Sequence, residues 1–566
     1  MLWQAISPPD NQQVQELTQE LKIPEEIAYL LIQRGITNYN SAKAYFRPSW
    51  EQLHDPFTMA DMQQAVERLQ QAIESQESVM VFGDYDVDGT TEVALVTSYL
   101  THYLDSILPY IPDRYTEGYG ISKKGIAHAK AEGITLIIAL DCGIKAQEEV
   151  AYAHSLGIDF IICDHHLPDE FLPKAVAVLD PKRKDCNYPF KELCGCGIGF
   201  KLIQGLQIHM NLEVAALSEY LDLVATAIAA DLVPVTGENR LLTALGLEQM
   251  KIRPRPGFQF FLANLKKPPR VSDLVFVIAP RINAAGRMNQ GINAVTLLLS
   301  KTQEEALPIA RSIEFFNTER RTTDERITQE ALQQIELQQE QSKDTTVVYH
   351  PSWHKGVIGI VASRLIETYY RPTVVLTQSE NVLAGSVRSV KGFDVYQALE
   401  ACKEVMIQFG GHKYAAGLTL EEERLEEFKN AFEKAVKERI NENQKTPILF
   451  YDAVLSLDQI STKLYRILCQ MAPFGPQNMK PVFMSRHCID KGGSRLVGKD
   501  QNHLKLEFFD SSGTVLQGIG FNLGHHHAKL KQKQPFSILY TLDENEFNGN
   551  KNLQLVVKDL QFEASL

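Results

Sequence analysis

Three aspartates, Asp84, Asp86 and Asp88, occupy alternate positions in the stretch VMVFGDYDVDGTT, residues 79–91. Carboxylates this close together repel one another strongly unless a cation lies among them. The alternative is a solvated turn in which an aspartate caps the next helix, but such a turn needs one aspartate rather than three. The spacing therefore favours a metal site.

Further acids and imidazoles follow other apolar runs. TLIIAL leads into Asp141, DFIIC leads into Asp164, His165 and His166, and Asp231 closes a long apolar segment. Singly, each has a structural explanation, because an aspartate can cap a helix and a buried neutral histidine is common. The recurrence at successive element ends favours one shared site. Many carboxylates with few imidazoles suit manganese or magnesium better than zinc or copper.

Short buried strands must position these residues. The run Val79–Gly83 is almost wholly apolar and predicts a strand, and Glu92–His102 predicts the helix after it. Strand and helix patterns then alternate as far as Cys163, which is typical of an α/β fold with a parallel, doubly wound sheet. Ligands of such sheets bind at the carboxyl ends of the strands, where these acids stand.

The 566 residues allow about three or four domains. A long charged stretch predicts a connecting helix, after which the α/β pattern resumes, and short β-like runs with turns fill the C-terminal part. We expect a helical lead-in at 1–50, an α/β domain at 51–300, a connecting helix at 301–343, a second α/β domain at 344–443 and a β-barrel of the OB type at 444–566, with one helix at 523–533.

The composition, with 44% hydrophobic and 22% charged residues, is that of an ordinary globular protein. The net charge of −13 argues weakly against a nucleic-acid partner, so any attraction to one must come from local basic patches or bound metal. Eight scattered cysteines suit a reducing compartment. The N-terminal residues lack a signal pattern and no apolar run is long enough to span a membrane, so we expect a cytoplasmic protein without membrane contact.

Cationic side chains recur among small residues. APRINAAGRMN sets Arg281, Asn283 and Arg287 beside alanine and glycine, which would let phosphate oxygens approach the guanidinium groups. A helix with solvated arginines is the alternative. Glycine-flanked loops also offer amides and cations to phosphates. These loops are HKG, GSVR and GGHK, with His354, Ser386, Arg388 and His412.

The segments GDYDVDGTT, LDCGI, DHH and AADLVP, in this order, resemble the four motifs of the DHH phosphoesterase superfamily. FVIAPRINAAGRMN, WHKGVIGIVASRL, GSVRS, GFDVY and FGGHKYAAG are similar to motifs of its RecJ branch, the bacterial single-strand-specific exonucleases. The similarity runs from about residue 50 to the C-terminus. It implies a parallel-sheet DHH domain, joined by a long helix to a DHH-associated domain, and a C-terminal OB-type barrel.

The resemblance also implies roles for the clustered residues. Asp141 would bridge two metal ions, manganese or magnesium, and His166 would lie beside the scissile phosphate as an acid or orienting group. Asp164 would support both histidines. Asp84 matches a family acid that is either a ligand or the holder of a metal-bound water. The ligand positions of the family correspond to Asp84, Asp86, Asp88, Asp141, His165 and Asp231.

The resemblance places phosphate contacts in three regions. Arg114 lies in the loop PDRYTEGYG, which would line the substrate path, although a solvated arginine is an equally good interpretation of the sequence alone. The other expected contacts are Arg281, Asn283, Arg287, His354, Ser386, Arg388 and His412. In the barrel, Lys499, His503, Lys505, Phe508 and Phe521 could contact single strands, but for each residue a structural role is the simpler interpretation.

The activity implied is hydrolysis of phosphodiester bonds in single-stranded DNA by two metal ions, with release of 5′-mononucleotides. The 5′-to-3′ polarity comes from the resemblance alone. So do the expected roles in DNA repair and recombination, beside single-strand-binding protein and a RecQ-type helicase. We expect a monomer.

Two other functions compete with this one. The first is a DHH phosphodiesterase on short oligoribonucleotides or cyclic dinucleotides, but the C-terminal module and the long helix favour a longer polymer. The second is a catalytically silent scaffold that binds DNA, but every expected acid and histidine is present. One departure is Glu92, where the family has a small residue; its carboxylate could crowd or repel the substrate.

Overall fold

The computed structural model describes residues 1–113, 116–287, 291–547 and 550–563. The chain divides into two compact units. Unit 1 comprises the described residues of Met1–Leu2, Arg281–Gln290 and Pro308–Leu449, and unit 2 those of Trp3–Pro280, Gly291–Leu307 and Phe450–Leu566.

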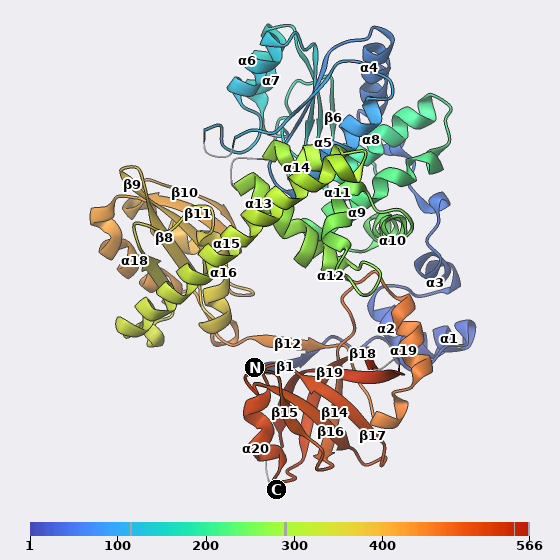
Figure 1. Cartoon of the computed structure of the whole chain (residues 1–566), viewed down its shortest axis with the longest axis vertical. Coiled ribbons are helices and arrows are strands. Elements are labelled where there is room, and N and C mark those ends of the chain that lie inside the picture. The colour runs from blue at the N-terminus through green and yellow to red at the C-terminus, as the bar shows by residue number, and fades with distance from the viewer. Residues whose placement is uncertain (114–115, 288–290, 548–549, 564–566) are drawn as a thin grey trace. The chain divides into compact units, whose positions relative to one another are not determined.

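Unit 2 contains a five-stranded sheet with the order β3-β2-β4-β5-β6. This sheet lies at the top of Figure 1. All neighbouring strands are parallel, which confirms the predicted parallel α/β sheet. β2 and β4 are buried along their whole length, and this explains their continuous apolar runs. The strands are β2 (Val79–Gly83), β3 (Ile107–Tyr110), β4 (Leu136–Leu140), β5 (Asp159–Cys163) and β6 (Ala177–Leu179).

Helices cover both faces of this sheet. α6 (Lys123–Ala131) and α7 (Gln147–Ser155) pack on one face through apolar residues that include Ile126 and Val150. β3 lies on one side of β2 in the sheet, whereas β4, β5 and β6 lie on the other side. Because such crossovers are right-handed, the connection from β2 to β3 places α5 (Val87–Leu100) on the face opposite to α6 and α7. α4 (Met62–Glu74) and α8 (Gly195–His209) belong to that second layer (Figure 1).

α5 begins earlier than the sequence indicated. Its first residue is Val87 rather than Glu92, and Asp86 is its N-cap, with the side chain accepting a hydrogen bond from the Gly89 amide at 3.1 Å. Gly89 makes this start possible, because a Cβ there would lie 2.6 Å from the backbone nitrogen of Asp84. The Gly-Thr-Thr segment, residues 89–91, therefore belongs to the first turns of a helix packed directly on the strand end.

The remaining helices of this part of unit 2 include the buried helix α9, which ends one residue before Asp231. α9 packs between α5 and α10, and this holds the C-terminal end of α9 beside the sheet edge. The helices are α9 (Leu221–Ala230), α10 (Gly237–Ile252), α11 (Pro256–Leu262), α12 (Val271–Asp273) and α14 (Gly291–Leu299).

The C-terminal residues form a β-barrel with the sheet order β13-β14-β18-β19-β17-β16-β15, closed by pairing of β14 with β16. This confirms the predicted barrel. Its helix is shorter than expected: α20 spans only His527–Leu530, after a 3₁₀ turn. The strands are β13 (Ala453–Val454), β14 (Phe483–Asp490), β15 (Arg495–Val497), β16 (His503–Phe509), β17 (Val515–Gly520), β18 (Phe536–Phe547) and β19 (Asn550–Phe562).

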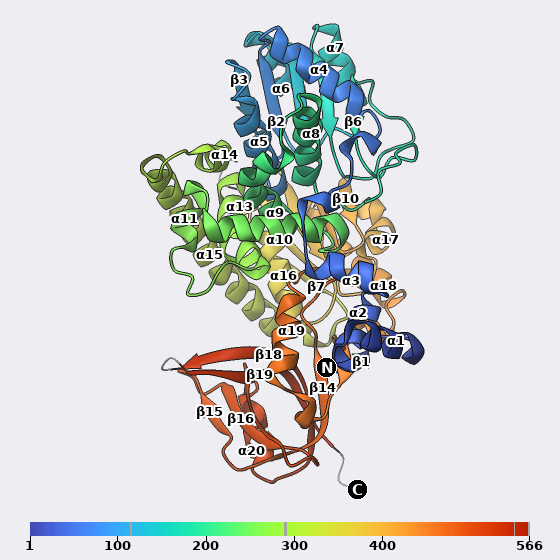
Figure 2. The same cartoon turned by 90° about the vertical axis from the view of Figure 1, so that its right-hand side faces the viewer.

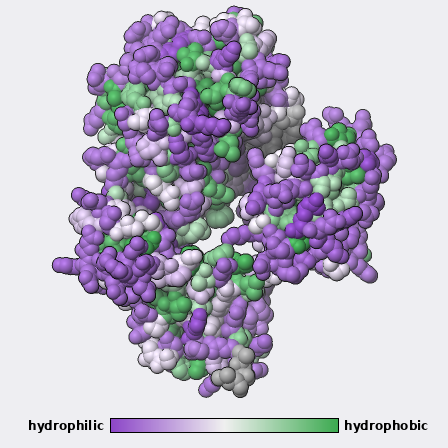
Figure 3. All heavy atoms as spheres, turned by 180° about the vertical axis from the view of Figure 1, so that it is seen from behind, coloured by the Kyte–Doolittle hydropathy of each residue, from purple (hydrophilic) through white to green (hydrophobic). Residues whose placement is uncertain are grey.

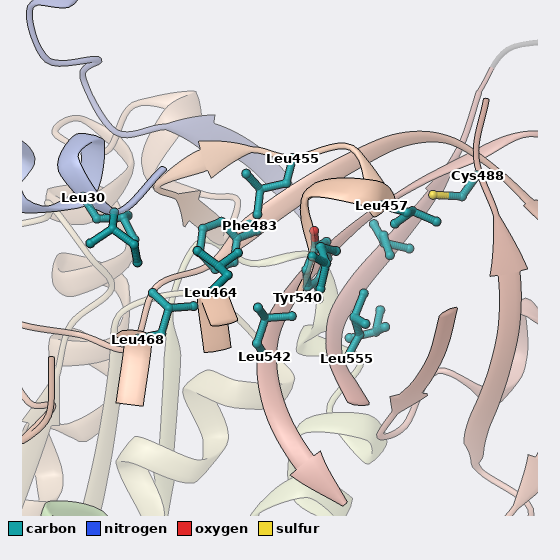
Figure 4. Close-up of a cluster of buried hydrophobic side chains, with 14 of the residues drawn as sticks. Leu30, Leu455, Leu457, Leu464, Leu468, Phe483, Cys488, Tyr540, Leu542 and Leu555 are labelled. Carbon is teal, nitrogen blue, oxygen red and sulfur yellow. The ribbon is translucent and has the colours of Figure 1, made fainter. Parts of the chain in front are cut away.

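The N-terminal helices share a hydrophobic core with this barrel (Figures 2 and 4). They are α1 (Asn11–Leu21), α2 (Glu25–Gln33) and α3 (Tyr39–Phe46). Leu30 of α2 lies near Leu464 and Leu468 of α19 (Thr462–Gln470) in Figure 4. The guanidinium of Arg34 also lies 3.3 Å from the carboxylate of Asp452. The first 50 residues are thus integral to the packing of the C-terminal part.

Unit 1 contains a mixed five-stranded sheet, β10-β11-β9-β8-β7, in which only β7 and β8 are parallel. Its strands are β7 (Thr346–Tyr349), β8 (Thr373–Ser379), β9 (Val382–Arg388), β10 (Gln408–His412) and β11 (Ala415–Leu420). Its helices are α16 (Ile358–Thr368), α17 (Val395–Glu400) and α18 (Leu425–Lys437). α13 (Ala279–Arg287) and the 35-residue helix α15 (Gln303–Leu337) precede the sheet, and β1 (Leu2–Ala5) pairs with β12 (Ile448–Tyr451).

The surface seen in Figure 3 is mostly hydrophilic, with hydrophobic residues scattered in small groups. Among the described residues, no helix combines the length and the apolar character needed to cross a membrane.

Candidate metal centre

One edge of the unit 2 sheet gathers the acids and imidazoles singled out above. Each lies at or just beyond the end of β2, β4, β5 or α9. The side-chain atoms that could bind a metal form three sets, and in each set all atoms lie within 4.8 Å of one another. Asp141 and His165 each belong to two of the sets. The sets are Asp84, Asp86 and Asp141; Asp141, His165 and His166; and Asp88, His165 and Asp231.

Asp141 lies at the centre of the cluster. It is 2% exposed, and its Oδ1 accepts no hydrogen bond from the described residues but faces His165 Nε2 at 3.2 Å. Its φ of 58° is in the left-handed region, which is uncommon for residues other than glycine and is often found at functional sites. Asp231 and Asp88 approach the same imidazole nitrogen at 3.7 and 3.9 Å.

The N-terminus of α8 fixes Asp88. Its two carboxylate oxygens accept hydrogen bonds from the backbone amides of Gly195 (2.7 Å) and Cys196 (2.8 Å). Even so, burial raises the pKa of Asp88 to about 7, assisted by the negative charge of Asp231. Burial, and then the charge of Asp86, likewise raises the pKa of Asp231 to about 7. Both shifts record the cost of crowding carboxylates without a cation.

Asp164 organises the two histidines. Its Oδ1 accepts hydrogen bonds from the backbone amides of His165 (2.8 Å) and His166 (3.1 Å) and from His166 Nδ1 (2.7 Å). Burial favours a higher pKa for Asp164, but the hydrogen bond from His166, the charge of His166 and the backbone hydrogen bonds together outweigh it, and the pKa is lowered. The same bond raises the pKa of His166. The His166 side chain is 43% exposed against 10% for His165, so His166 is the one open to a substrate.

A second cluster lies in unit 1, at the N-terminus of α16. The guanidinium of Arg388 donates to Ser386 Oγ at 3.1 Å, and both groups border Gly359, where a Cβ would lie within 2.9 Å of each. Burial lowers the pKa of Arg388. A cationic fork, a hydroxyl and the amides of a helix N-terminus form a suitable site for an anion such as phosphate.

The sheet of unit 1 extends this cluster. His412 lies opposite Ala415 on the neighbouring strand, and Ala415 lies opposite Arg388 on the next strand. The three side chains are therefore on the same face of the sheet. Ser386, two residues before Arg388 and on the same face, is in register with two glycines of the neighbouring strands. A Cβ on one of them, Gly410, would meet nothing within 4 Å, so this face of the sheet is open. His354 lies in the loop before α16, where its Nδ1 accepts from the Gly356 amide at 3.1 Å.

The other expected phosphate contacts are placed differently. Arg281 is ion-paired with Glu314 of α15. Asn283 is half-buried on α13. Arg114 and the side chain of Arg287 lie outside the described residues. The structure therefore joins Ser386, Arg388 and the start of α16 in one cluster.

Residues 78–228 match the family described as "DHH family, N-terminal domain", 343–438 the "DHHA1 domain", and 451–559 the "RecJ OB domain". Proteins named single-stranded-DNA-specific exonuclease RecJ are similar over almost the whole chain. The protein of Bacillus subtilis is 35% identical over 99% of this chain and 70% of its own length, and that of Escherichia coli is 33% identical over 97% and 99%. The chain belongs to the RecJ family.

Solved RecJ structures agree with this assignment. The RecJ of Thermus thermophilus in complex with Mn²⁺ matches with a TM-score of 0.85 and 25% identity, over 100% of this chain and 80% of that one. An exonuclease RecJ bound to manganese matches with a TM-score of 0.60 and 29% identity, over 69% of this chain and 97% of that one.

The residues of this RecJ-family chain fit such ions. Oxygen ligands with one or two imidazoles suit Mn²⁺ and Mg²⁺, and the buried Oδ1 of Asp141 has no hydrogen-bond donor that would compete with a cation. A divalent cation would also reverse the raised pKa of Asp88 and Asp231, because it favours the charged carboxylates. Cys194 and Cys196 are buried thiols, in keeping with a structural rather than a zinc-binding role.

Two residues beside the cluster, Tyr119 and Asp180, were not predicted from the sequence. In the loop that contains Tyr119, the sequence pointed to Arg114 instead. The hydroxyl of Tyr119 donates to the backbone oxygen of Asp141 at 3.1 Å and lies 3.4 Å from His166 Nε2. Asp180, at the end of β6, is fully buried, and burial raises its pKa to about 7. Their place in the chain was the available signal, since Asp180 directly follows the apolar run of β6 and Tyr119 lies in the loop between β3 and α6.

Glu92 occupies a different place from the one we expected. It is fully buried, and its carboxylate packs against Gly195 and Gly199 of α8. Burial, then the charges of Asp88 and Asp164, raises its pKa well above the usual value. Glu92 therefore lies within the α5–α8 interface and does not face a substrate. Phe508 of the barrel is likewise a core residue, not a stacking surface.

The raised pKa values predict a pH-dependent affinity for metal. Protons compete with cations for Asp88 and Asp231 below about pH 7, so Mn²⁺ affinity should fall about tenfold per pH unit for each proton displaced. Because the folded-state pKa values exceed the unfolded value of 3.8, Asp88 and Asp231 stabilise the metal-free fold most at low pH, and their contribution is lost as the pH rises to about 7. Mn²⁺ titrations at pH 6, 7 and 8, with thermal unfolding in chelator, test both trends; a flat Mn²⁺ affinity would contradict them.

Proposed function

We propose that this chain is a metal-dependent exonuclease. It hydrolyses phosphodiester bonds in single-stranded DNA from the 5′ end and releases 5′-mononucleotides, in DNA repair and recombination. The observation that carries the proposal is the convergence of Asp141 and His165 with four further acids at one sheet edge, in a chain of the RecJ family.

The residues proposed to hold two divalent cations, Mn²⁺ or Mg²⁺, are Asp84, Asp86, Asp88, Asp141, His165 and Asp231. When bound, such a pair activates water as the nucleophile and neutralises charge on the attacked phosphate. Asp141 contributes to two of the linked sets, which suits a carboxylate shared between cations. The α8 amides hold Asp88 in a fixed direction, so this carboxylate needs little reorganisation when a cation binds.

His166 is proposed to act on the substrate. Asp164 accepts the Nδ1 proton, which directs the Nε2 edge of the exposed ring away from Asp164 and toward Tyr119. An imidazole held in this way can donate a hydrogen bond to a phosphate oxygen or a proton to the leaving 3′ oxygen. Asp164 orients the ring and favours its charged form.

The unit 1 cluster is proposed to bind phosphates of the DNA. Ser386 and Arg388 with the amides of α16 form its centre, and His354 and His412 add contacts nearby. Arg114, Arg281, Asn283 and Arg287 remain proposed contacts. For Arg281 this requires exchange of its pairing with Glu314 for pairing with a phosphate.

Arg388→Met tests this anion site. We expect binding of a 5′-phosphorylated single strand, measured with Ca²⁺ in place of Mn²⁺, to weaken about tenfold, because a charged hydrogen bond to phosphate contributes about 1.5–3 kcal/mol. Lys403→Met, which removes an exposed cation of the same unit, is the matched control and should change binding less than twofold. Equal effects of the two variants would exclude a phosphate site at Arg388.

The domain limits given above are part of the proposal: 1–50, 51–300, 301–343, 344–443 and 444–566. The barrel would contact single-stranded DNA, with His503 and the exposed ring of Phe521 in edge contact on its surface. We also propose a monomer that works in the cytoplasm beside single-strand-binding protein and a RecQ-type helicase. The eight free cysteines suit a reducing compartment.

Digestion of end-labelled strands tests the activity. Single strands blocked at either end, and the matching duplex, are incubated with Mn²⁺, Mg²⁺ or chelator. We expect mononucleotides only from single strands with a free 5′ end and only with metal. Cleavage restricted to short oligoribonucleotides or cyclic dinucleotides would favour a small-substrate phosphodiesterase. Metal-independent binding without any cleavage would favour a silent scaffold.

A further inference from the structure

The loop after β6 carries an unassigned cation, Lys182. The buried carboxylate of Asp180 accepts the backbone amide of Lys182 at 2.6 Å, and the Arg183 amide bonds to the Asp180 carbonyl at 3.3 Å. These bonds close a tight turn with Lys182 inside it. The backbone of Lys182 is thus held by a residue at the strand end itself.

Arg183 anchors the other side of the turn. Its guanidinium, 6% exposed, contacts the carboxylates of Asp61 (2.6 Å) and Asp185 (2.6 Å) and the carbonyl of Val178. Lys182 lies between this buried arginine and the buried Pro181 but is itself only half-buried. The turn therefore presents one lysine side chain from a rigid backbone.

The turn lies along the metal centre. β5 and β6 are parallel with Cys163 opposite Leu179, and the Asp164 amide continues the ladder by bonding to the Leu179 carbonyl at 3.0 Å. The chain beyond β6 thus runs beside Asp164, His165 and His166. The charge of Lys182 also acts on the centre: burial chiefly lowers the pKa of His165 and the lysine lowers it further, and the lysine opposes the burial that raises the pKa of Asp231.

Lys182 has no fixed carboxylate partner. Within the described part of the chain it forms no ion pair with an acid within 4.0 Å, although Asp180 and Asp231 are near enough to interact with its charge. A flexible ammonium on a fixed turn, beside a centre that develops negative charge, is suited to bind a phosphate oxygen. A lysine that only balanced Asp180 would be expected to pair with it directly.

We propose that Lys182 is a catalytic residue that binds the phosphate under attack and stabilises its charge in the transition state. This inference rests on the proposed phosphodiester hydrolysis. No bond to Lys182 forms or breaks, since the ammonium keeps its three protons and acts as a donor and point charge.

Lys182→Met is compared with Lys184→Met, which removes an exposed lysine from the same turn with the same change of net charge. Values of kcat and KM are measured on end-labelled single-stranded DNA with Mn²⁺. Lys182→Met should reduce kcat by roughly 10–100-fold, the range found when one oxyanion donor or acid–base group is removed. Lys184→Met should stay within twofold of the original chain, and Lys182→Arg should recover most of the loss.

Mn²⁺ binding, followed by electron paramagnetic resonance, separates this role from a structural one. Removal of a positive charge beside His165 and Asp231 should leave Mn²⁺ affinity unchanged or tighter, and thermal unfolding should match that of Lys184→Met. Weaker Mn²⁺ binding in proportion to the loss of kcat would overturn the proposal, as would a kcat within twofold of Lys184→Met. If the original chain and Lys184→Met also failed to cleave DNA, the proposed function itself would fall, and this inference with it.

Discussion

Asp141→Asn should reduce kcat for single-stranded DNA by about a thousandfold or more, equivalent to about 4 kcal/mol of transition-state stabilisation. Asp141 is common to two of the three linked ligand sets, so its loss weakens both cation positions together. Asparagine keeps the shape of the side chain but removes the charge that a bridging ligand must supply.

The substitution should leave the fold intact. Asp141 has a φ of 58°, and asparagine is among the residues that adopt this left-handed conformation most readily. Removal of one charge from a crowded buried set also relieves repulsion in the metal-free chain. We therefore expect unchanged or higher thermal stability in chelator, together with weaker Mn²⁺ binding.

The exposed residue Asp105 provides the matched control, since Asp105→Asn removes the same charge away from the cluster. Its kcat should stay within twofold of the original value. If Asp141→Asn retained more than a tenth of the activity, Asp141 could not be a shared ligand.

Glu238→Ala should have the largest effect on stability, a loss of about 3–5 kcal/mol. Glu238, in the first turn of α10, is paired with Lys201 of α8 at 2.9 Å, and neither side chain has any exposed surface. Its carboxylate also accepts hydrogen bonds from the Tyr188 hydroxyl and from the His54 amide. Truncation removes the carboxylate that balances the buried Lys201 ammonium, which keeps its hydrogen bond to the His54 carbonyl.

This pair also ties α10, the helix that follows Asp231, to α8. α9 ends just before Asp231 and α10 begins at Gly237, so loosening α10 should weaken Mn²⁺ binding as well as the fold. Denaturant unfolding followed by tryptophan fluorescence, with parallel Mn²⁺ titration, measures both effects.

Glu248→Ala serves as the control, because Glu248 pairs with Lys251 on the exposed side of the same helix. Its effect should be within about 0.5 kcal/mol. Similar losses of unfolding free energy for the two variants would show that the buried ion pair contributes no more to stability than the exposed one.

The sequence allowed this cluster of acids and imidazoles to be predicted because its members follow uninterrupted apolar runs. β2 and β4 are fully buried, so their ends are visible in the sequence, and parallel topology brings those ends to one edge. Asp231 could be included for the same reason, since α9 is apolar except for Asp222 and Thr226.

Other features depend on tertiary contacts that no local pattern encodes. The early start of α5 requires the close approach of Gly89 to Asp84. Burial of Glu92 requires two glycines one turn apart on α8, a helix more than a hundred residues away. The shared core of the N-terminal helices and the barrel joins opposite ends of the chain. The pairing of Arg281 with Glu314 likewise shows only in three dimensions.

The central claim is that acids and imidazoles from four elements hold two divalent cations. Anomalous diffraction at the manganese absorption edge, from crystals grown with Mn²⁺, tests it most directly. Two separate peaks are expected beside Asp141, one near Asp84 and Asp86 and the other near His165 and Asp231, and Asp141→Asn should abolish or weaken both. A single peak, or manganese bound away from Asp141, would contradict the account.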